Sequence, residues 1–168
     1  MIATSRAGSR GETAEVLTFD LNGETFALGA GLVREVLDII PETEVPGAAA
    51  FVGAVINFRG RIIPLADLRL AFGIGLKPVT PESRIVVIEF ELGGEPSLIG
   101  LRADKVHEVT TIDGATLEDP PAVGLRWPAQ FIEFLARRGG DVIVLPDLAQ
   151  IFAARGEASV VPFFSSQH

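Results

Sequence analysis

The base of a nucleophilic triad in this chain would have to be one of two histidines, His107 or His168, and cysteine is absent. A nucleophilic triad needs an oriented base within reach of a hydroxyl or thiol. His107 lies in an expected strand beside Glu108, and neighbouring strand residues point to opposite faces, so these two side chains cannot share an ion. His168 is the last residue. We therefore expect no catalytic triad and no metal site.

Carboxylates and glycines add little catalytic potential. Asp67, Asp104 and Asp147 recur along the chain, but an Asp before a short apolar segment caps a helix more often than it transfers protons. Gly73-Ile74-Gly75 lacks the third glycine and the preceding strand of a dinucleotide-binding fingerprint. We expect a loop there, no phosphate-binding motif, no cofactor and no enzymatic activity.

Composition narrows the possible partners and location. The net charge of -8 opposes binding to nucleic acid, which attracts clustered Lys and Arg. The lack of cysteine fits a reducing compartment, so we expect a cytoplasmic protein. The N-terminus, Met1–Glu12, has no apolar run that could span a membrane, so we expect no direct membrane insertion. We predict a flexible lead over residues 1–14, one domain over 15–155 and an irregular tail over 156–168, in which Phe163 and Phe164 could dock.

The elements that must position any functional side chain are mainly strands. Short apolar segments alternate with Gly, Pro and Asn, which is typical of a β-protein. Three hairpins are predicted, which argues against a parallel α/β sheet. Their strands are Val16–Leu21 with Thr25–Leu28 across Asn22-Gly23, Phe51–Phe58 with Arg61–Leu65 across Arg59-Gly60, and Arg84–Leu92 with Pro96–Leu101 across Gly93-Gly94.

Helical patterns are short. They cover Ala66–Phe72, Ala129–Arg138 and Leu148–Ala154. In the second of these, the spacing of Phe131 and Phe134 favours a helix, whereas Ile132 also fits a strand, so both interpretations remain open.

A faint internal repeat runs through the chain. Val33–Val36 is echoed by Val106–Val109, and Gly60–Leu68 is echoed in the same order by Gly140–Leu148. Small barrels of about five strands bury one face of each strand and remove most exposed sheet edge. Two such barrels, one per repeat, would account for the length of the chain.

The run Gly53–Arg69 (GAVINFRGRIIPLADLR) closely resembles the signature of the CheW family, the coupling proteins of bacterial chemotaxis. The resemblance extends over about Val16–Phe152. It implies a mainly β fold of two intertwined five-stranded SH3-like barrels with a few short helices and no catalytic site. It also implies a scaffold that couples the cytoplasmic tip of methyl-accepting chemoreceptors to the regulatory domain of a CheA-type histidine kinase, with self-association in arrays and recruitment to membrane receptors.

The resemblance also implies a receptor groove between the barrels, with an apolar floor and charged flanks that suit a helix. Its predicted residues are Val33, Glu35, Asn57, Phe58, Arg59 and Val106, and Gly60 is the structural turn residue. Each partner-binding residue except Phe58 also has a structural interpretation. The two valines could be core residues, Arg59 a solvated turn residue, Glu35 the partner of a nearby Arg, and Asn57 the residue that fixes the turn.

Two stretches differ from the family pattern. Phe131-Ile132-Glu133 replaces an apolar pair followed by Gly, and Arg126-Trp127-Pro128 is unfamiliar. These differences leave the kinase-facing surface undefined and are compatible with a divergent paralogue of a non-flagellar chemosensory pathway. An alternative from another class is a small-ligand-binding β-barrel with a cavity lined by Phe and Val.

Overall fold

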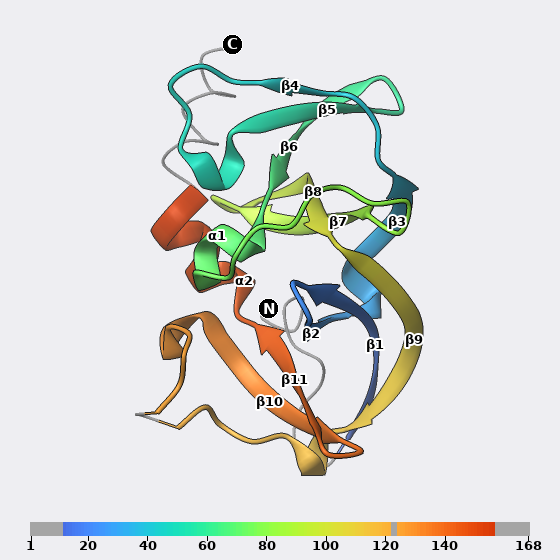
Figure 1. The fold of residues 1–168 in the computed structure, drawn as a ribbon, viewed down its shortest axis with the longest axis vertical. Helices are drawn as coiled ribbons and strands as arrows, with labels where there is room; N and C mark the ends of the chain where they lie inside the picture. The colour runs from blue at the N-terminus through green and yellow to red at the C-terminus, as the bar shows by residue number, and fades with distance from the viewer. Residues whose placement is uncertain (1–11, 122–123, 157–168) are drawn as a thin grey trace.

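The computed structural model describes residues 12–121 and 124–156, which form two curled sheets stacked one above the other (Figure 1). The lower sheet has the strand order β10-β11-β2-β1-β9, and the upper sheet has the order β3-β7-β8-β6-β5-β4. The lower sheet contains β1 (Thr13–Leu21), β2 (Glu24–Gly29), β9 (Lys105–Asp113), β10 (Ile132–Arg138) and β11 (Asp141–Pro146). The upper sheet contains β3 (Val33–Asp38), β4 (Glu42–Glu44), β5 (Ala54–Phe58), β6 (Arg61–Ala66), β7 (Arg84–Leu92) and β8 (Glu95–Ala103).

Short helical segments connect these strands. The two α-helices are α1 (Leu68–Phe72) and α2 (Leu148–Ile151), and a π-helical turn, Phe152–Gly156, follows α2. Single 3-10 turns cover Ala30–Leu32, Ala50–Val52, Gly114–Thr116 and Ala129–Phe131. In the described part of the chain, no helix has the length and apolar character needed to cross a membrane.

All three predicted hairpins are confirmed as antiparallel pairs. Both residues of each turn have positive φ, the conformation that matches the twist of the flanking strands. The turn dipeptides are Asn22-Gly23, Arg59-Gly60 and Gly93-Gly94. The predicted strand from Phe51 starts only at Ala54, because Ala50–Val52 forms a 3-10 turn that buries Phe51 and Val52. β1 begins at Thr13, before the predicted domain boundary, and Phe163 and Phe164 lie outside the described residues.

The helical prediction for Ala129–Arg138 is wrong beyond its first turn, since Ile132–Arg138 is strand β10. The register between β10 and β11 shifts between Ile132 and Phe134. Such a bulge adds a residue to the strand and interrupts its period of two. The apolar residues around it consequently mimic helical spacing, and the strand alternative suggested by Ile132 is correct.

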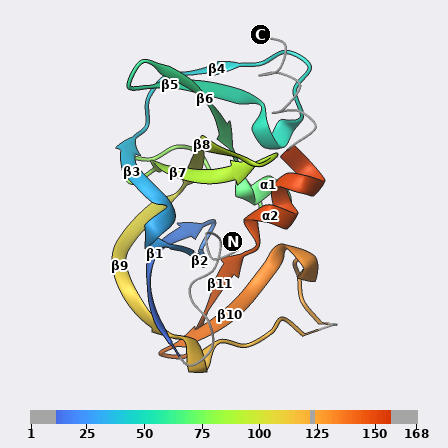
Figure 2. The same cartoon turned by 180° about the vertical axis from the view of Figure 1, so that it is seen from behind.

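The two sequence repeats do not each form one barrel. The lower sheet takes β1 and β2 from the first repeat and β9 to β11 from the second, whereas the upper sheet takes β7 and β8 from the second and β3 to β6 from the first. Seen from behind, β9 curves from the end of β8 into the lower sheet (Figure 2). Each sheet is therefore built from strands of both repeats. The upper sheet has six strands, not five, because it also contains β4.

Equivalent irregularities support the repeat. The register of β3 shifts between Val33 and Glu35, and that of β9 shifts between Val106 and Val109, the matching segment of the second copy. Both copies also place one parallel strand pair, β6 with β8 and β11 with β2, before a short helix.

Three apolar clusters form the core. Strand alternation divides them, because neighbouring residues point to opposite faces. On β7, Ile85 and Val87 fill the upper sheet, whereas Val86 and Ile88 join a larger cluster that contains residues from both sheets and both α-helices. The lower sheet has its own cluster, which includes Phe134 and Ile143. The two barrels thus share most of their core.

Candidate functional site

The turn between β5 and β6 presents three of the predicted partner-binding residues. Asn57 Oδ1 accepts a hydrogen bond from the Gly60 amide at 3.0 Å, so the Asn57 side chain fixes the turn, as its structural interpretation predicts. The Arg59 guanidinium lies over the Phe58 ring, 5.4 Å from the centroid. Phe58 itself is buried at 8% exposure and belongs to the upper cluster.

Arg59 also pairs with Glu35 of β3. Arg59 Nε donates to Glu35 Oε1 at 3.1 Å, and Arg59 Nη2 contacts the same oxygen. The Arg59 side chain is 70% exposed and that of Glu35 is 35% exposed. The structure therefore brings two predicted residues from separate elements together and leaves much of the Arg59 side chain accessible.

A surface cavity of about 490 Å³ adjoins this pair. Two further ionic residues in it, Arg34 and Glu89, form an ion pair at 2.8 Å. Arg61, the first residue of β6, lies across the hairpin from Phe58. Pro96, Ser97 and Leu98 of β8 complete the wall. The cavity, which we call the turn pocket, has charged and apolar walls but no nucleophile–base pair.

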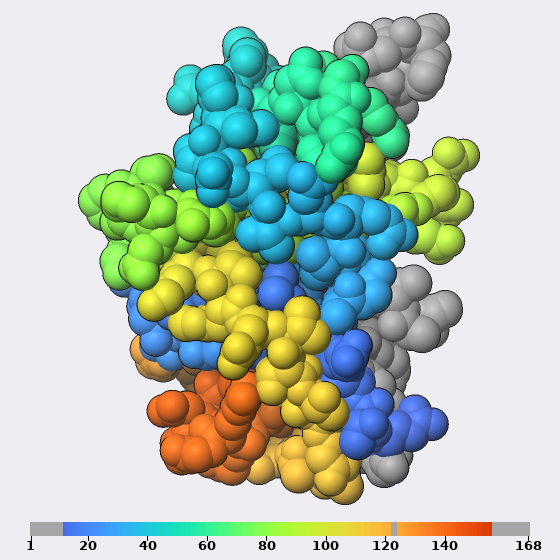
Figure 3. Space-filling view, turned by 90° about the vertical axis from the view of Figure 1, so that its right-hand side faces the viewer, coloured from blue at the N-terminus to red at the C-terminus, as the bar shows by residue number. Residues whose placement is uncertain are grey.

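Val33 and Val106 lie elsewhere on this side of the molecule. Both are half-buried, pack against the shared core and do not line the turn pocket. Their strands, β3 and β9, lie side by side in Figure 3. The same strands expose Val36 (39%) and Val109 (52%), which our sequence analysis did not propose. These two valines are the last residues of the repeated Val-x-Glu-Val segments, so the repeat pointed to them as equivalent positions.

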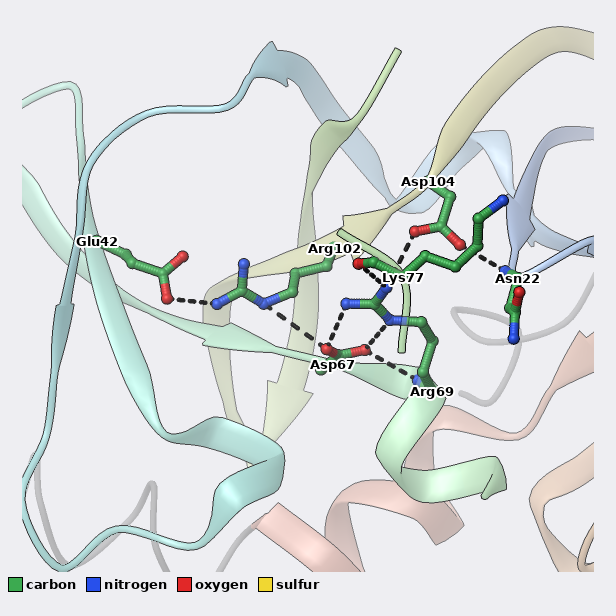
Figure 4. A network of polar contacts seen from close by, with 7 residues as sticks. All are labelled: Asn22, Glu42, Asp67, Arg69, Lys77, Arg102 and Asp104. Carbon is green, nitrogen blue, oxygen red and sulfur yellow. Dashed lines mark hydrogen bonds and ion pairs between the residues drawn. The ribbon is translucent and has the colours of Figure 1, made fainter. Parts of the chain in front are cut away.

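A second polar cluster, centred on Arg69, stands between the sheets (Figure 4). Arg69 Nε and Nη2 donate to the two carboxylate oxygens of Asp67 at 2.9 and 2.8 Å, and Nη1 donates to Asp104 at 3.0 Å. Asp104 also accepts the backbone N–H of Asn22 in the β1–β2 turn. The hydrogen bond to Asp67 is the main reason that the pKa of Arg69 is raised, against the opposing effect of burial. The cluster is structural, since both charges of the central pair are buried.

Arg102 extends this cluster to β4. Its Nε lies 3.7 Å from Asp67 Oδ2, and its Nη2 contacts Glu42. We call the whole set the inter-barrel network; its members are Asn22, Glu42, Asp67, Arg69, Arg102, Asp104 and the carbonyl of Lys77.

The carboxylates singled out in the sequence have different roles. Asp67 and Asp147 cap α1 and α2 by accepting the amides of Arg69 and Gln150. The capping prediction is wrong for Asp104, which lies between β8 and β9 and binds Arg69 instead. His107 contacts Asp20 at 3.0 Å. In residues 12–121 and 124–156, no group of three His, Asp or Glu side chains is arranged to hold a metal ion.

We expect Gly60→Ala to destabilise the protein by about 1–2 kcal/mol, the usual cost of the left-handed conformation for a residue with a Cβ. Gly60 has a φ of +82°, and an added Cβ would meet nothing within 4 Å, so backbone strain alone sets the cost. Urea unfolding measures it. Gly31→Ala is the matched control, because Gly31 also faces open space without positive φ. Equal stability of the two variants would contradict the prediction.

The chain is similar to known proteins in both sequence and structure. A sequence model of the CheW-like domain matches residues 15–156. The probable chemotaxis protein CheW of Rhizobium etli is 27% identical over 139 residues, which cover 83% of this chain and 87% of that protein. The chemotaxis protein CheW of Bacillus subtilis is 24% identical, covering 88% and 92%. The crystal structure of scaffolding protein TtCheW from Thermoanaerobacter tengcongensis has a TM-score of 0.75 and 34% identity, with 85% of this chain and 90% of that chain covered.

Proposed function

The chain belongs to the CheW family and is a chemotaxis scaffold, and from this premise we propose that it couples the cytoplasmic tip of chemoreceptors to a CheA-type histidine kinase. We assign the role to residues 15–155 and place it in the cytoplasm, at the membrane-receptor arrays. Such a scaffold acts by binding alone, so we expect no turnover of any substrate.

The Glu35–Arg59 pair is the observation that carries the proposed receptor contact. Arg59 is held by Glu35 and Phe58, yet its side chain is 70% exposed. A preorganised guanidinium loses less conformational freedom when a partner binds. Exposed Val36 and Val109 on β3 and β9 offer apolar contacts on the same side of the molecule. Charged flanks with an apolar strip match the groove in which an amphipathic helix binds.

We propose different roles for the remaining predicted residues. Phe58 and Asn57 position the turn, and Gly60 supplies its conformation. Val33 and Val106 support the apolar floor of the receptor groove beneath the exposed valines, since both pack on the shared core.

The kinase contact rests on the family alone. The kinase's regulatory domain has the same double-barrel fold in the family, and we propose barrel-to-barrel contacts with it and between copies of this chain.

The small-ligand alternative gains no support from the barrel interiors. Buried side chains such as Phe134 and Ile143 occupy the lower sheet, and Ile56 and Val87 occupy the upper one. Small barrels typically fill their interiors in this way.

We expect Arg59→Asn to weaken binding to a purified receptor cytoplasmic fragment at least about tenfold, a loss of roughly 1.4 kcal/mol. Asn tolerates the positive φ of +51° at this position, and Asn-Gly is a preferred turn pair, so unfolding free energy should change by less than about 0.5 kcal/mol. Calorimetry measures the binding and urea titration the stability.

Arg138→Asn is the control for this experiment. Arg138 is an exposed arginine of the lower sheet, away from the turn pocket. If Arg59→Asn binds the receptor fragment as the wild type does, the proposed receptor site is wrong. If the wild type binds neither receptor fragment nor kinase, the coupling function itself is wrong.

A further inference from the structure

The turn pocket contains one more cation than anion. Three arginines line it, Arg34, Arg59 and Arg61, together with two glutamates, Glu35 and Glu89. Each glutamate already forms an ion pair, Glu89 with Arg34 and Glu35 with Arg59. Within the described residues, the exposed Arg61 side chain makes neither an ion pair nor a hydrogen bond. The pocket is therefore positively charged on a protein whose net charge is -8.

We infer that Arg61 binds a carboxylate side chain, Asp or Glu, on the helix of the receptor, an assignment that rests on the proposed function. A guanidinium is a planar fork that matches a carboxylate with two parallel hydrogen bonds. Arg34 is paired with Glu89 and Arg59 with Glu35. The positive charge of Arg61 is therefore the one that remains available to a carboxylate of the receptor. Pro96 and Leu98 line the same pocket, so a helix bound against them would shield the charge pair from water and strengthen it.

The second repeat lacks this arrangement. When Gly60 is matched with Gly140, the counterpart of Arg61 is Asp141 and that of Arg59 is Gly139. The equivalent turn of the lower sheet therefore has the opposite charge at the decisive position. Of these two equivalent turns, the one in the upper sheet therefore offers a carboxylate site and the one in the lower sheet does not.

Arg61→Gln tests this assignment, because it removes the charge and keeps a long polar side chain. We expect its affinity for the purified receptor cytoplasmic fragment to fall about tenfold at low salt and to depend less on salt than that of the wild type. Arg138→Gln is the matched control, with the same charge change on the lower sheet, and should bind as the wild type does. Stability should be unchanged in both variants, since both side chains are exposed.

Replacing the acidic residues of the receptor fragment by Gln, one at a time, identifies the partner. One replacement should weaken binding to the wild type but have no further effect on Arg61→Gln, as a double-mutant cycle requires. Equal binding of Arg61→Gln and wild type overturns the inference. It is equally wrong if Arg61→Gln alters only the binding of inorganic phosphate, which would indicate a site for free anions. If Arg59→Asn still weakens binding in either case, the proposed function stands without this contact.

Discussion

Arg69→Ala is expected to lower the free energy of unfolding by about 3–5 kcal/mol, because it leaves a buried carboxylate without its main partner. Arg69 and Asp67 are each less than a tenth exposed, and Arg69 also binds Asp104. Arg102, 3.7 Å from Asp67, can compensate only in part. Since Asp104 also holds the β1–β2 turn through Asn22, the substitution should loosen the contact between the two sheets as well. Urea unfolding followed by the fluorescence of Trp127, the single tryptophan, measures the loss.

The internal repeat provides the control for Arg69→Ala. Asp147 occupies the place of Asp67 in the second copy, where Ala149 replaces the arginine. Asp147→Ala should cost only about 1 kcal/mol, the value of a helix cap. Asp67→Ala should cost several times more, and Asp67→Ala combined with Arg69→Ala should cost less than the sum of the two. Additive losses would mean that the buried pair does not act as a unit.

Local features of the fold were predictable because local chemistry determines them. The dipeptides Asn22-Gly23, Arg59-Gly60 and Gly93-Gly94 each end in a glycine that adopts positive φ readily, and all three hairpins form there. The repeat alone predicted one barrel per copy, whereas the resemblance to the CheW family implied the intertwined barrels that are observed. Alternation specifies which face of β3 is half-buried and which is exposed, but its pairing with β7 depends on long-range contacts between the repeats.

The residues of the candidate site were predictable from the sequence, but the contacts between them were not. The family signature contains Arg59 and Glu35 lies upstream of it, yet their pairing is a long-range contact that sequence spacing does not specify. The inter-barrel network was missed, although Asp67-Leu68-Arg69 becomes Asp147-Leu148-Ala149 in the second copy. An arginine present in one copy alone was a signal that its role is specific to that copy.

Phe26→Ala is expected to destabilise the protein by about 3–5 kcal/mol, and the loss of the Phe26 ring should destabilise both barrels together. Phe26 is fully buried in the shared cluster, with ring centroids 5.1 Å from Phe72, 6.1 Å from Phe19 and 6.2 Å from Trp127. It belongs to β2 of the lower sheet, whereas Phe72 belongs to α1, which follows β6 of the upper sheet. Removing the ring leaves a cavity between the sheets and abolishes aromatic contacts worth about 0.5–1.5 kcal/mol each.

Circular dichroism and Trp127 fluorescence should report one common unfolding transition for Phe26→Ala, because the cluster shared by both barrels is larger than the cluster within either one. Ile99 follows Phe26 at the same spacing by which Val106 follows Val33, so it is the counterpart of Phe26 in the second copy. It is equally buried in the shared cluster but lacks ring contacts. Ile99→Ala should therefore cost about 2–5 kcal/mol and also unfold in one step. Val109→Ala, at a 52% exposed position of β9, should change stability by less than about 0.5 kcal/mol. Two separate transitions in Phe26→Ala would show that the barrels unfold independently and that the shared cluster does not couple them.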